Sequence, residues 1–413
     1  MAQQEQVPQA RAALLPKIAV TVSDGHDRAG VNSGHETVYL SKGYTIALRQ
    51  NLFDATNWQA YKQAEASVAR AGVEYNATQQ LLMLQVCESY FAVLGAQDDL
   101  RFAAHNEQTL RDQLELTTRR YEEGDATIVD TQEAQAEFER ASADVIAAES
   151  TMRARRADLR RRVGRDIGDL AVLGDDENLT QFYETDEDAW IDKASAQSLD
   201  VAQRQLTEYI AELELKKSRA AFLPTVSVSL SHSAGNLEYL NNQTSISTTG
   251  NTNSFRQGTT NVAMLQVSIP LFDGFSTLSK EREARAQKQK AAADLDDARL
   301  EAETHEKQIF LDLEDAFARE HTLAEALKSS ELALASNRAA YGVGLRINSD
   351  VLRAEDIVYT TKRDLARNRY EIVLDHLRLR ANAGDLGEDD VRVVDALLHT
   401  PMSNASARSR SAP

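Results

Sequence analysis

Two short segments of the chain carry polar and small residues at the same spacing, and these residue types form helix caps, hydrogen bonds and ion pairs in exposed turns. Residues 120–130 read RYEEGDATIVD and residues 340–350 read AYGVGLRINSD. The matching positions hold the same residue in both segments: Tyr121 and Tyr341, Gly124 and Gly344, Asp130 and Asp350. A turn that occurs twice predicts two similar helical hairpins.

Helix capping is the simplest interpretation of these residues. Glycine adopts left-handed backbone angles without steric cost, so Gly124 and Gly344 are expected to be C-caps. Asp130 is expected to be an N-cap, with Glu133 three residues later completing a capping box. Arg346 is a single Arg beside Gly344 in an exposed turn and has no such local task. It is therefore available for a contact outside its own turn.

The sequence lacks the patterns that mark an enzyme or a metal protein. GVGLRI, which begins at residue 342, starts like a dinucleotide fingerprint, but Ile347 stands where the third Gly is required and no strand precedes it. The eight histidines form no His-x-x-x-His pair, and no segment resembles a nucleophile elbow. The single cysteine, Cys87, lies in an apolar helical stretch and is interpreted as a core thiol. We predict no catalytic residue, no metal and no cofactor.

Composition and charge exclude other classes. The chain has 413 residues and a net charge of −18, which disfavours nucleic acid and anionic membrane surfaces as partners. No apolar run approaches the roughly 18 residues that a transmembrane helix needs. The first residues, MAQQEQVPQAR, lack the apolar core of a signal peptide. Taken alone, these observations would place the chain in the cytosol.

Proline placement predicts very long helices. The six prolines leave residues 17–223 and 271–400 without a helix breaker, and strong helix formers dominate both stretches. Apolar residues there recur at helical spacing along one seam, which is interrupted by Ala316, Glu320 and Ser330. A seam this weak predicts helices packed in a larger bundle. The seam residues are Ile309, Leu313, Leu323, Leu327 and Leu334.

Two β-hairpins are predicted where the composition changes, after Pro16 and after Pro224. Apolar and polar residues alternate there, as expected of strands with one apolar and one polar face. Each strand is expected to be about ten residues long, the length of a tilted strand that crosses a bilayer. The alternating apolar residues are Tyr44, Ile46, Leu48, Val226, Val228 and Leu230.

The chain is therefore a tandem repeat in which each half reads hairpin, long helix, turn, long helix. LFD occurs at residues 52–54 and again at 271–273. A helix from Asp54 to Arg120 would extend about 100 Å, which would carry both turns to the same end of a rod, far from the hairpins. The predicted divisions are a first repeat (1–163), an acidic linker (164–198), a second repeat (199–387) and a C-terminal tail (388–413).

Four strands cannot close a barrel, and an open sheet edge in lipid would leave backbone groups unsatisfied. Several chains must therefore share one barrel. Three chains that supply four strands each would give a barrel of about twelve strands.

In the order and spacing of its segments, the chain resembles the TolC-like outer-membrane channel proteins of bacterial efflux and type I secretion. The resemblance covers nearly the whole chain. The segments that carry it include ALRQNLFD, CESYFAVL, RYEEGDATIVDTQEAQ, SRAAFLPTVSV, QVSIPLFDG, AAYGVGLRINSDVLRAED and NRYEIVLDHLRLRANAG.

The resemblance implies a mainly α fold with a minor β part, in which long α-helical hairpins form a tunnel through the periplasm. Four strands per chain would contribute to a shared trimeric β-barrel in the outer membrane. The homotrimer would be a passive duct that docks onto an inner-membrane ABC or RND-type pump through a periplasmic adaptor protein. The family packs the acidic linker around the equator of the tunnel.

The resemblance also implies roles for residues in the two turns. Asp130, Tyr341 and Arg346 match the contacts that close the tunnel at its periplasmic tip, and Asp350 matches an acidic ring that narrows the entrance. The family often has a second acid where this chain has Arg353, so cation selectivity can differ here.

Gly124, Gly344 and Leu345 match the tip that contacts the adaptor. Asp125 replaces the apolar residue expected after Gly124, which puts the first docking site in doubt.

The two ends of the chain raise separate expectations. The second repeat has a helix that leads into its hairpin, whereas the first repeat has only VPQARAALLP, so a signal peptide and most of a first helix are expected to be missing. The tail after Gly387 ends in SNASARSRSAP and is expected to be disordered.

Two interpretations from other classes remain open. A soluble coiled-coil scaffold or periplasmic adaptor would explain the helices and the charge, and a filament protein would explain the repeat. Neither class needs two amphipathic hairpins of membrane length. Of the three interpretations, only the channel predicts a protein that requires detergent to stay in solution.

Overall fold

The computed structural model describes residues 2–30, 36–124, 126–174, 177–236, 257–343 and 345–399. The chain divides into two compact units. The first contains Met1–Glu74 and Ala202–Asp297, and the second contains Tyr75–Val201 and Ala298–Pro413.

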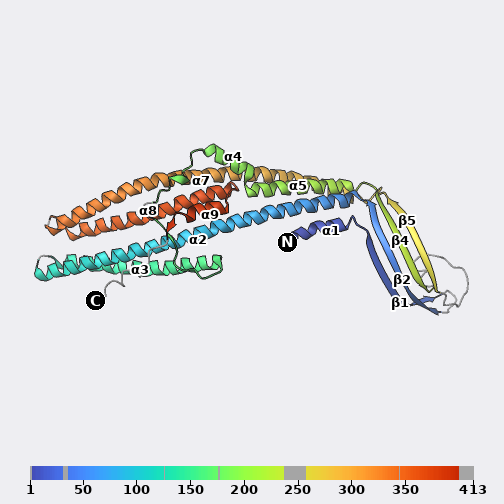
Figure 1. Ribbon diagram of the computed structural model, residues 1–413, viewed down its shortest axis with the longest axis horizontal. Helices are drawn as coiled ribbons and strands as arrows, with labels where there is room; N and C mark the ends of the chain where they lie inside the picture. The colour runs from blue at the N-terminus through green and yellow to red at the C-terminus, as the bar shows by residue number, and fades with distance from the viewer. Residues whose placement is uncertain are drawn as a thin grey trace. The chain divides into compact units, whose positions relative to one another are not determined.

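The first unit contains a four-stranded antiparallel sheet in the order β1-β2-β4-β5. Figure 1 shows the strands side by side. The two predicted hairpins are confirmed, and pairing between β2 and β4 joins them. The strands are longer than the ten residues predicted: β1 (Lys17–Gly30), β2 (Glu36–Phe53), β4 (Thr225–Asn236) and β5 (Gln257–Ser268). The predicted loops between the strands of each hairpin include residues 31–35 and 237–256, which lie outside the described residues.

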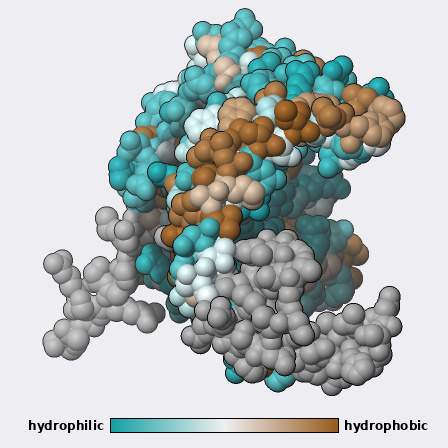
Figure 2. Space-filling view, turned by 90° about the vertical axis from the view of Figure 1, so that its right-hand side faces the viewer, coloured by the Kyte–Doolittle hydropathy of each residue, from teal (hydrophilic) through white to brown (hydrophobic). Residues whose placement is uncertain are grey.

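The sheet has one apolar and one polar face, as the alternation predicted. Cross-strand register places Val20 opposite Ile46, and Leu48 opposite both Ile18 and Leu230. On the other face Thr45 and Ser233 share a hydrogen bond of 2.9 Å. Hydrophobic residues gather on the side of the molecule that faces the viewer in Figure 2. Five apolar side chains of the edge strands are 57% to 76% exposed in the single chain: Ile18, Val20, Val22, Leu265 and Val267.

The same capping device starts the long helix of each repeat. The Asp54 carboxylate accepts a hydrogen bond of 3.1 Å from the backbone N–H of Asn57. The Asp273 carboxylate accepts one of 2.8 Å from the backbone N–H of Thr277. The aspartate of each LFD segment therefore satisfies a free N–H in the first turn of the helix that follows. The first unit also contains η1 (Ala2–Glu5), α1 (Gln6–Ala12) and most of α5 (Leu199–Ala220).

Four long helices run through the second unit as two helical hairpins, α2–α3 and α7–α8 (Figure 1). α2 has 69 residues and α7 has 67. Both run on from the strands of the first unit, and 69 residues correspond to about 100 Å of helix. None of the described helices is apolar enough over a sufficient length to cross a membrane. The helices are α2 (Ala55–Glu123), α3 (Ile128–Val163), α7 (Ser276–Gly342) and α8 (Asn348–Asn382).

α2, α7 and α8 share one main hydrophobic core. Ile309 and Leu313 of the predicted seam are buried in it, together with Ala316, whereas Leu323, Leu327 and Leu334 are only partly buried. The predicted seam is therefore buried at Ile309 and Leu313 and is only partly buried farther along α7. Other buried members include Phe91 and Leu94 from α2 with Ile372, Val373 and Leu377 from α8.

The linker between the repeats is structured. It contains β3 (Val172–Leu173), η2 (Thr180–Phe182) and α4 (Glu187–Gln197). Phe182 is fully buried and joins the main core, so the linker is packed onto the helices of the second unit.

The C-terminal tail after Gly387 was expected to be disordered, and this prediction is wrong for the residues up to His399. Residues after Gly387 form α9 (Glu388–Asp395) and β6 (Leu398–His399), and β6 pairs with β3. Buried Leu386 and Val394 join the main core, which holds this segment against the helices. Residues 400–413 lie outside the described residues.

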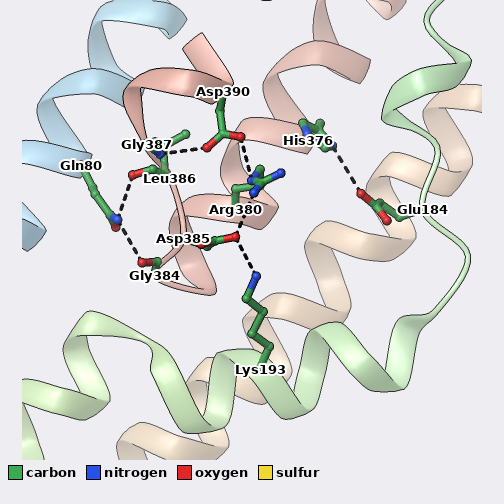
Figure 3. Close-up of polar contacts among 10 residues, drawn as sticks. All are labelled: Gln80, Glu184, Lys193, His376, Arg380, Gly384, Asp385, Leu386, Gly387 and Asp390. Atoms are coloured by element: carbon green, nitrogen blue, oxygen red, sulfur yellow. Dashed lines mark hydrogen bonds and ion pairs between the residues drawn. The ribbon is translucent and has the colours of Figure 1, made fainter. Parts of the chain in front are cut away.

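Polar contacts hold the C-terminal segment in place (Figure 3). The Gln80 amide donates hydrogen bonds of 3.0 Å to the backbone carbonyls of Gly384 and Leu386. Arg380 forms ion pairs with Asp385 at 2.9 Å and with Asp390 at 3.0 Å. Lys193 of α4 pairs with Asp385 at 2.7 Å, so the linker and the segment share one network.

A buried carboxyl group of α7 lies beside the last residue of α8. Glu306 of α7 is fully buried and accepts a hydrogen bond of 2.7 Å from the Asn382 amide through Oε2. Its Oε1 has no hydrogen-bond partner among the described residues. Burial raises the pKa of Glu306 to about 7, because removal from water penalises the charged form.

Replacing Glu306 with Gln should remove part of the pH dependence of stability. The folded pKa of about 7 lies above the ordinary value of 4.5 for a glutamate, so the folded chain retains a proton that the unfolded chain loses. The stabilisation is complete below the lower pKa and is lost as pH rises through the higher one, by up to about 3 kcal/mol. Glu306→Gln should therefore be more stable than wild type at about pH 8 and similar at about pH 4.

Chemical unfolding across that pH range measures this difference. Exposed Glu301 on the same helix supplies the control Glu301→Gln. His376 contributes in the opposite direction, because burial lowers its pKa to about 4, and the comparison between variant and wild type cancels this contribution. An equal response of both variants would contradict the assignment to Glu306.

Candidate functional site at the helical tips

The first tip confirms one predicted cap and corrects another. α2 ends at Glu123, and Gly124 follows with a φ of +86°. Its backbone N–H donates a hydrogen bond of 3.1 Å to the carbonyl of Tyr121, as expected of a glycine that ends a helix. The prediction that Asp130 is the N-cap of α3 is wrong, because Thr127 holds that position.

Asp130 lies three residues inside the cap and completes a capping box with Thr127. The Thr127 hydroxyl accepts from the Asp130 backbone N–H at 3.2 Å, and the Asp130 carboxylate accepts from the Thr127 backbone N–H at 2.9 Å. The capping box is therefore Thr127 with Asp130, and not Asp130 with Glu133. The hydroxyl of Thr127 makes it a competent cap at the right spacing from an acid.

The second tip differs at one position that changes the chemistry of the turn. α8 begins at Asn348, and its N-cap is Ile347, which has no side chain that could cap. Ile347 occupies the place of Thr127 in the repeat, so Asp350 has no hydroxyl to bind. Instead its carboxylate forms an ion pair of 3.3 Å with Arg346. Arg346, for which no capping role was expected, is therefore held by an ion pair within its own tip.

The tip predicted to contact an adaptor is apolar and exposed where the structure describes it. Leu345 is 80% exposed, and its neighbours Val343 and Ile347 are 71% and 64% exposed. Gly344 lies outside the described residues, so the predicted C-cap there is not described.

Contacts between the two hairpins were missed by the sequence analysis. The guanidinium carbon of Arg120 lies 4.7 Å from the centre of the Tyr341 ring. The Gln113 amide donates a hydrogen bond to the side chain of Asn348, which is buried. These contacts join α2 to α7 and α8. The sequence signals them only in that the other repeat has Ala340, Ala333 and Ile128 in place of Arg120, Gln113 and Asn348.

Further contacts join the hairpins above the tips. Leu110, Ala141 and Leu352 form a small hydrophobic cluster of α2, α3 and α8. Arg140 of α3 forms an ion pair of 3.4 Å with Asp356 of α8. The two hairpins are thus packed together in one chain before any partner is present.

Within one chain, the three residues predicted to close the tunnel do not bond to one another. Asp130 bonds to Thr127, Tyr341 lies under Arg120, and Arg346 pairs with Asp350. Arg346 and Asp350 have side chains 57% and 27% exposed, so their pairing contributes at most about 1 kcal/mol. Contacts this weak can be exchanged for others at low cost. Among the described residues, no group of three or more His, Cys, Asp or Glu could hold a metal.

Comparison with known proteins gives consistent similarities. The family model described as outer membrane efflux protein matches residues 1–165 and 190–385. Alkaline protease secretion protein AprF of Pseudomonas aeruginosa is 29% identical, over 94% of this chain and 80% of the relative. Outer membrane protein TolC of Vibrio cholerae is 30% identical, over 95% of this chain and 87% of the relative.

Solved structures show the fold. CusC superposes with a TM-score of 0.79 at 15% identity, covering 92% of this chain and 86% of the other. The outer membrane protein VceC of Vibrio cholerae superposes with a TM-score of 0.77 at 18% identity, covering 94% and 91%. The predicted fold class is confirmed by these likenesses.

Exchanging the residues that distinguish the two caps should change the stability of the first turns. Thr127→Val removes the hydroxyl cap of α3 and should destabilise its first turn by about 1 kcal/mol. Ile347→Thr should supply a cap to α8 and protect its first turn. Hydrogen exchange of the amides in both turns measures these effects. Thr118→Val, in the interior of α2, is the control, and equal loss of protection in that variant would contradict a specific capping effect.

Proposed function

Because the chain belongs to the outer membrane efflux protein family, we propose that it is the outer-membrane channel of a tripartite efflux or type I secretion system. In this proposal it is a passive export duct that is gated at its helical tips. The observation that carries the proposal is a sheet with an exposed apolar face and two open edges, on the same chain as two long helical hairpins.

The open edges support a barrel shared between copies. β1 and β5 each pair on one side only within the described sheet. Backbone groups left unpaired in lipid are costly, so β5 of one copy would pair with β1 of the next. Three copies would give about twelve strands. The exposed apolar face would contact lipid, and the serine-rich face of β4 would line a water-filled interior.

Aromatic residues at the junction of strands and helices support a membrane interface there. Trp58 is 49% exposed, Phe272 is 76% exposed and Phe275 is 67% exposed, and all three lie close to the ends of the strands. Aromatic side chains are enriched at the boundary between lipid and water. α2 and α7 run on from this junction, and we place them in the periplasm.

The gate would be formed between copies. Since Asp130 and Arg346 do not pair within the chain, an ion pair between them would join neighbouring copies of the homotrimer. Formation of that pair would take Arg346 from Asp350, leaving three Asp350 carboxylates around the axis to attract cations. Exposed ion pairs contribute about 0–1 kcal/mol each, so a docking partner could open such a gate.

Partners would dock at the apolar second tip. Leu345, with Gly344 beside it in the sequence, would contact a periplasmic adaptor, which would link the channel to an inner-membrane ABC or RND-type pump. Gly124 would take part at the first tip. The name of AprF refers to protease secretion, and the name of TtgC of Pseudomonas putida refers to an efflux pump, so both kinds of system occur among the relatives. The alternative of a soluble scaffold leaves the exposed apolar face of the sheet unexplained.

Planar-bilayer recordings test the channel and the gate together. Protein purified in detergent should migrate as a trimer and give a small, cation-preferring conductance. Asp130→Ala/Arg346→Ala should raise that conductance severalfold, because the contact between copies is lost. Glu115→Ala/Arg119→Ala removes one acid and one base that pair within α2, so like the gate variant it leaves the net charge unchanged, and it should leave the conductance unchanged.

The outcomes separate the parts of the proposal. If folded trimers do not conduct, the channel function is wrong. If wild type conducts and both double variants behave like it, the channel stands and these residues do not form the gate.

A further inference from the structure

Arg120 and Tyr341 form a contact between the two hairpins close to both tips. Arg120 is in the last turn of α2, which ends at Glu123, and Tyr341 is in the last turn of α7, which ends at Gly342. The guanidinium carbon is 4.7 Å from the ring centre, within the range of a cation–π interaction. Both side chains are half-buried. Neighbouring Arg119 is exposed and pairs with Glu115 of its own helix.

The contact can form in one direction only. In the repeat, Arg120 corresponds to Ala340 and Tyr341 corresponds to Tyr121. The first hairpin thus supplies the cation and the second supplies the ring. The reciprocal pair would be Ala340 and Tyr121, and alanine has no charge to place on the ring. Tyr121 is 44% exposed. The difference between the repeats therefore leaves this link in one direction, from Arg120 of the first hairpin to Tyr341 of the second.

The interaction uses the face of the ring, and the Tyr341 hydroxyl has no hydrogen-bond partner among the described residues. A guanidinium is planar and remains charged at all physiological pH values, so it can stack on an aromatic ring over a wide range of conditions. The ring is thereby fixed against α2 while its hydroxyl remains available to another partner.

We propose that Arg120 is a positioning residue of the gate, which holds Tyr341 and the last turn of α7 against α2 in the closed channel. The inference rests on the proposed channel function and adds a residue that acts within one chain. Outward movement of the second hairpin would break this contact, so Arg120 opposes opening through Tyr341.

Arg120→Ala tests the proposal in planar bilayers. One exposed cation–π contact shifts an equilibrium by roughly 2- to 5-fold, and three copies acting together would lower the closed-to-open ratio by roughly 10- to 100-fold. Arg119→Ala is the matched control, since it removes the same charge one residue away, and it should leave the ratio unchanged. Arg120→Lys retains the cation and should restore part of the closed fraction.

Variants of Tyr341 separate the ring from the hydroxyl. In a Tyr341→Phe background the effect of Arg120→Ala should persist, because the ring remains. In a Tyr341→Leu background the effect should disappear. An undiminished effect of Arg120→Ala on the leucine background would overturn the proposal, as would an equal effect of Arg119→Ala.

Hydrogen exchange keeps the test independent of conduction. Arg120→Ala should increase exchange in the last turn of α7 in the detergent-solubilised protein, and Arg119→Ala should not. If wild-type protein fails to conduct, the proposed function fails, while this measurement still decides whether Arg120 holds Tyr341. Unchanged exchange in Arg120→Ala would overturn the positioning role.

Discussion

The need to satisfy backbone hydrogen bonds at the edges of the four-stranded sheet governs the rest of the structure. Within the described sheet, β1 and β5 each have an open edge, and the apolar face between them is suited to lipid, where no water can bind the free groups. In the proposed channel, strands of other copies would fill these edges. Because α2 and α7 follow the strands along the chain, copies joined through the sheet would also bring their helices together. The proposed function at the tips of the helices would then depend on hydrogen bonds in the sheet.

The two repeats have diverged at positions that give their tips different chemistry. Thr127 caps α3 and binds Asp130, whereas Ile347 leaves Asp350 to pair with Arg346. The difference between Thr127 and Ile347, which has no hydroxyl, therefore gives the two aspartates different partners. The fold tolerates this because a missing N-cap costs only about 1 kcal/mol. An internal repeat can in this way supply a fixed hairpin and a more labile one from nearly the same sequence.

Local patterns predicted the elements well, but contacts between distant segments could not be predicted. Alternation gave the faces of the strands, and Gly124 was a reliable helix end, since both depend on neighbouring residues. The Asp130 cap was misplaced by three residues because Thr127 competes for the same role. Gln80 bonds to Gly384 and Gln113 bonds to Asn348, and nothing near either glutamine in the sequence indicates these partners. The ordered C-terminal segment was missed for the same reason. The residue roles at the gate remain predictions.

The distribution of buried contacts explains why movement would be confined to the tips. The main core places large apolar side chains of α2, α7 and α8 together with the linker and the C-terminal segment, and Arg380 ties that segment to Asp385 and Asp390. Separating these elements would expose the core and break several ion pairs. Near the tips the hydrophobic cluster is small, and the Arg140–Asp356 and Arg346–Asp350 ion pairs are partly exposed. In the proposed channel, free energy from a docking partner would therefore separate the hairpins at the tips before it disturbed the core.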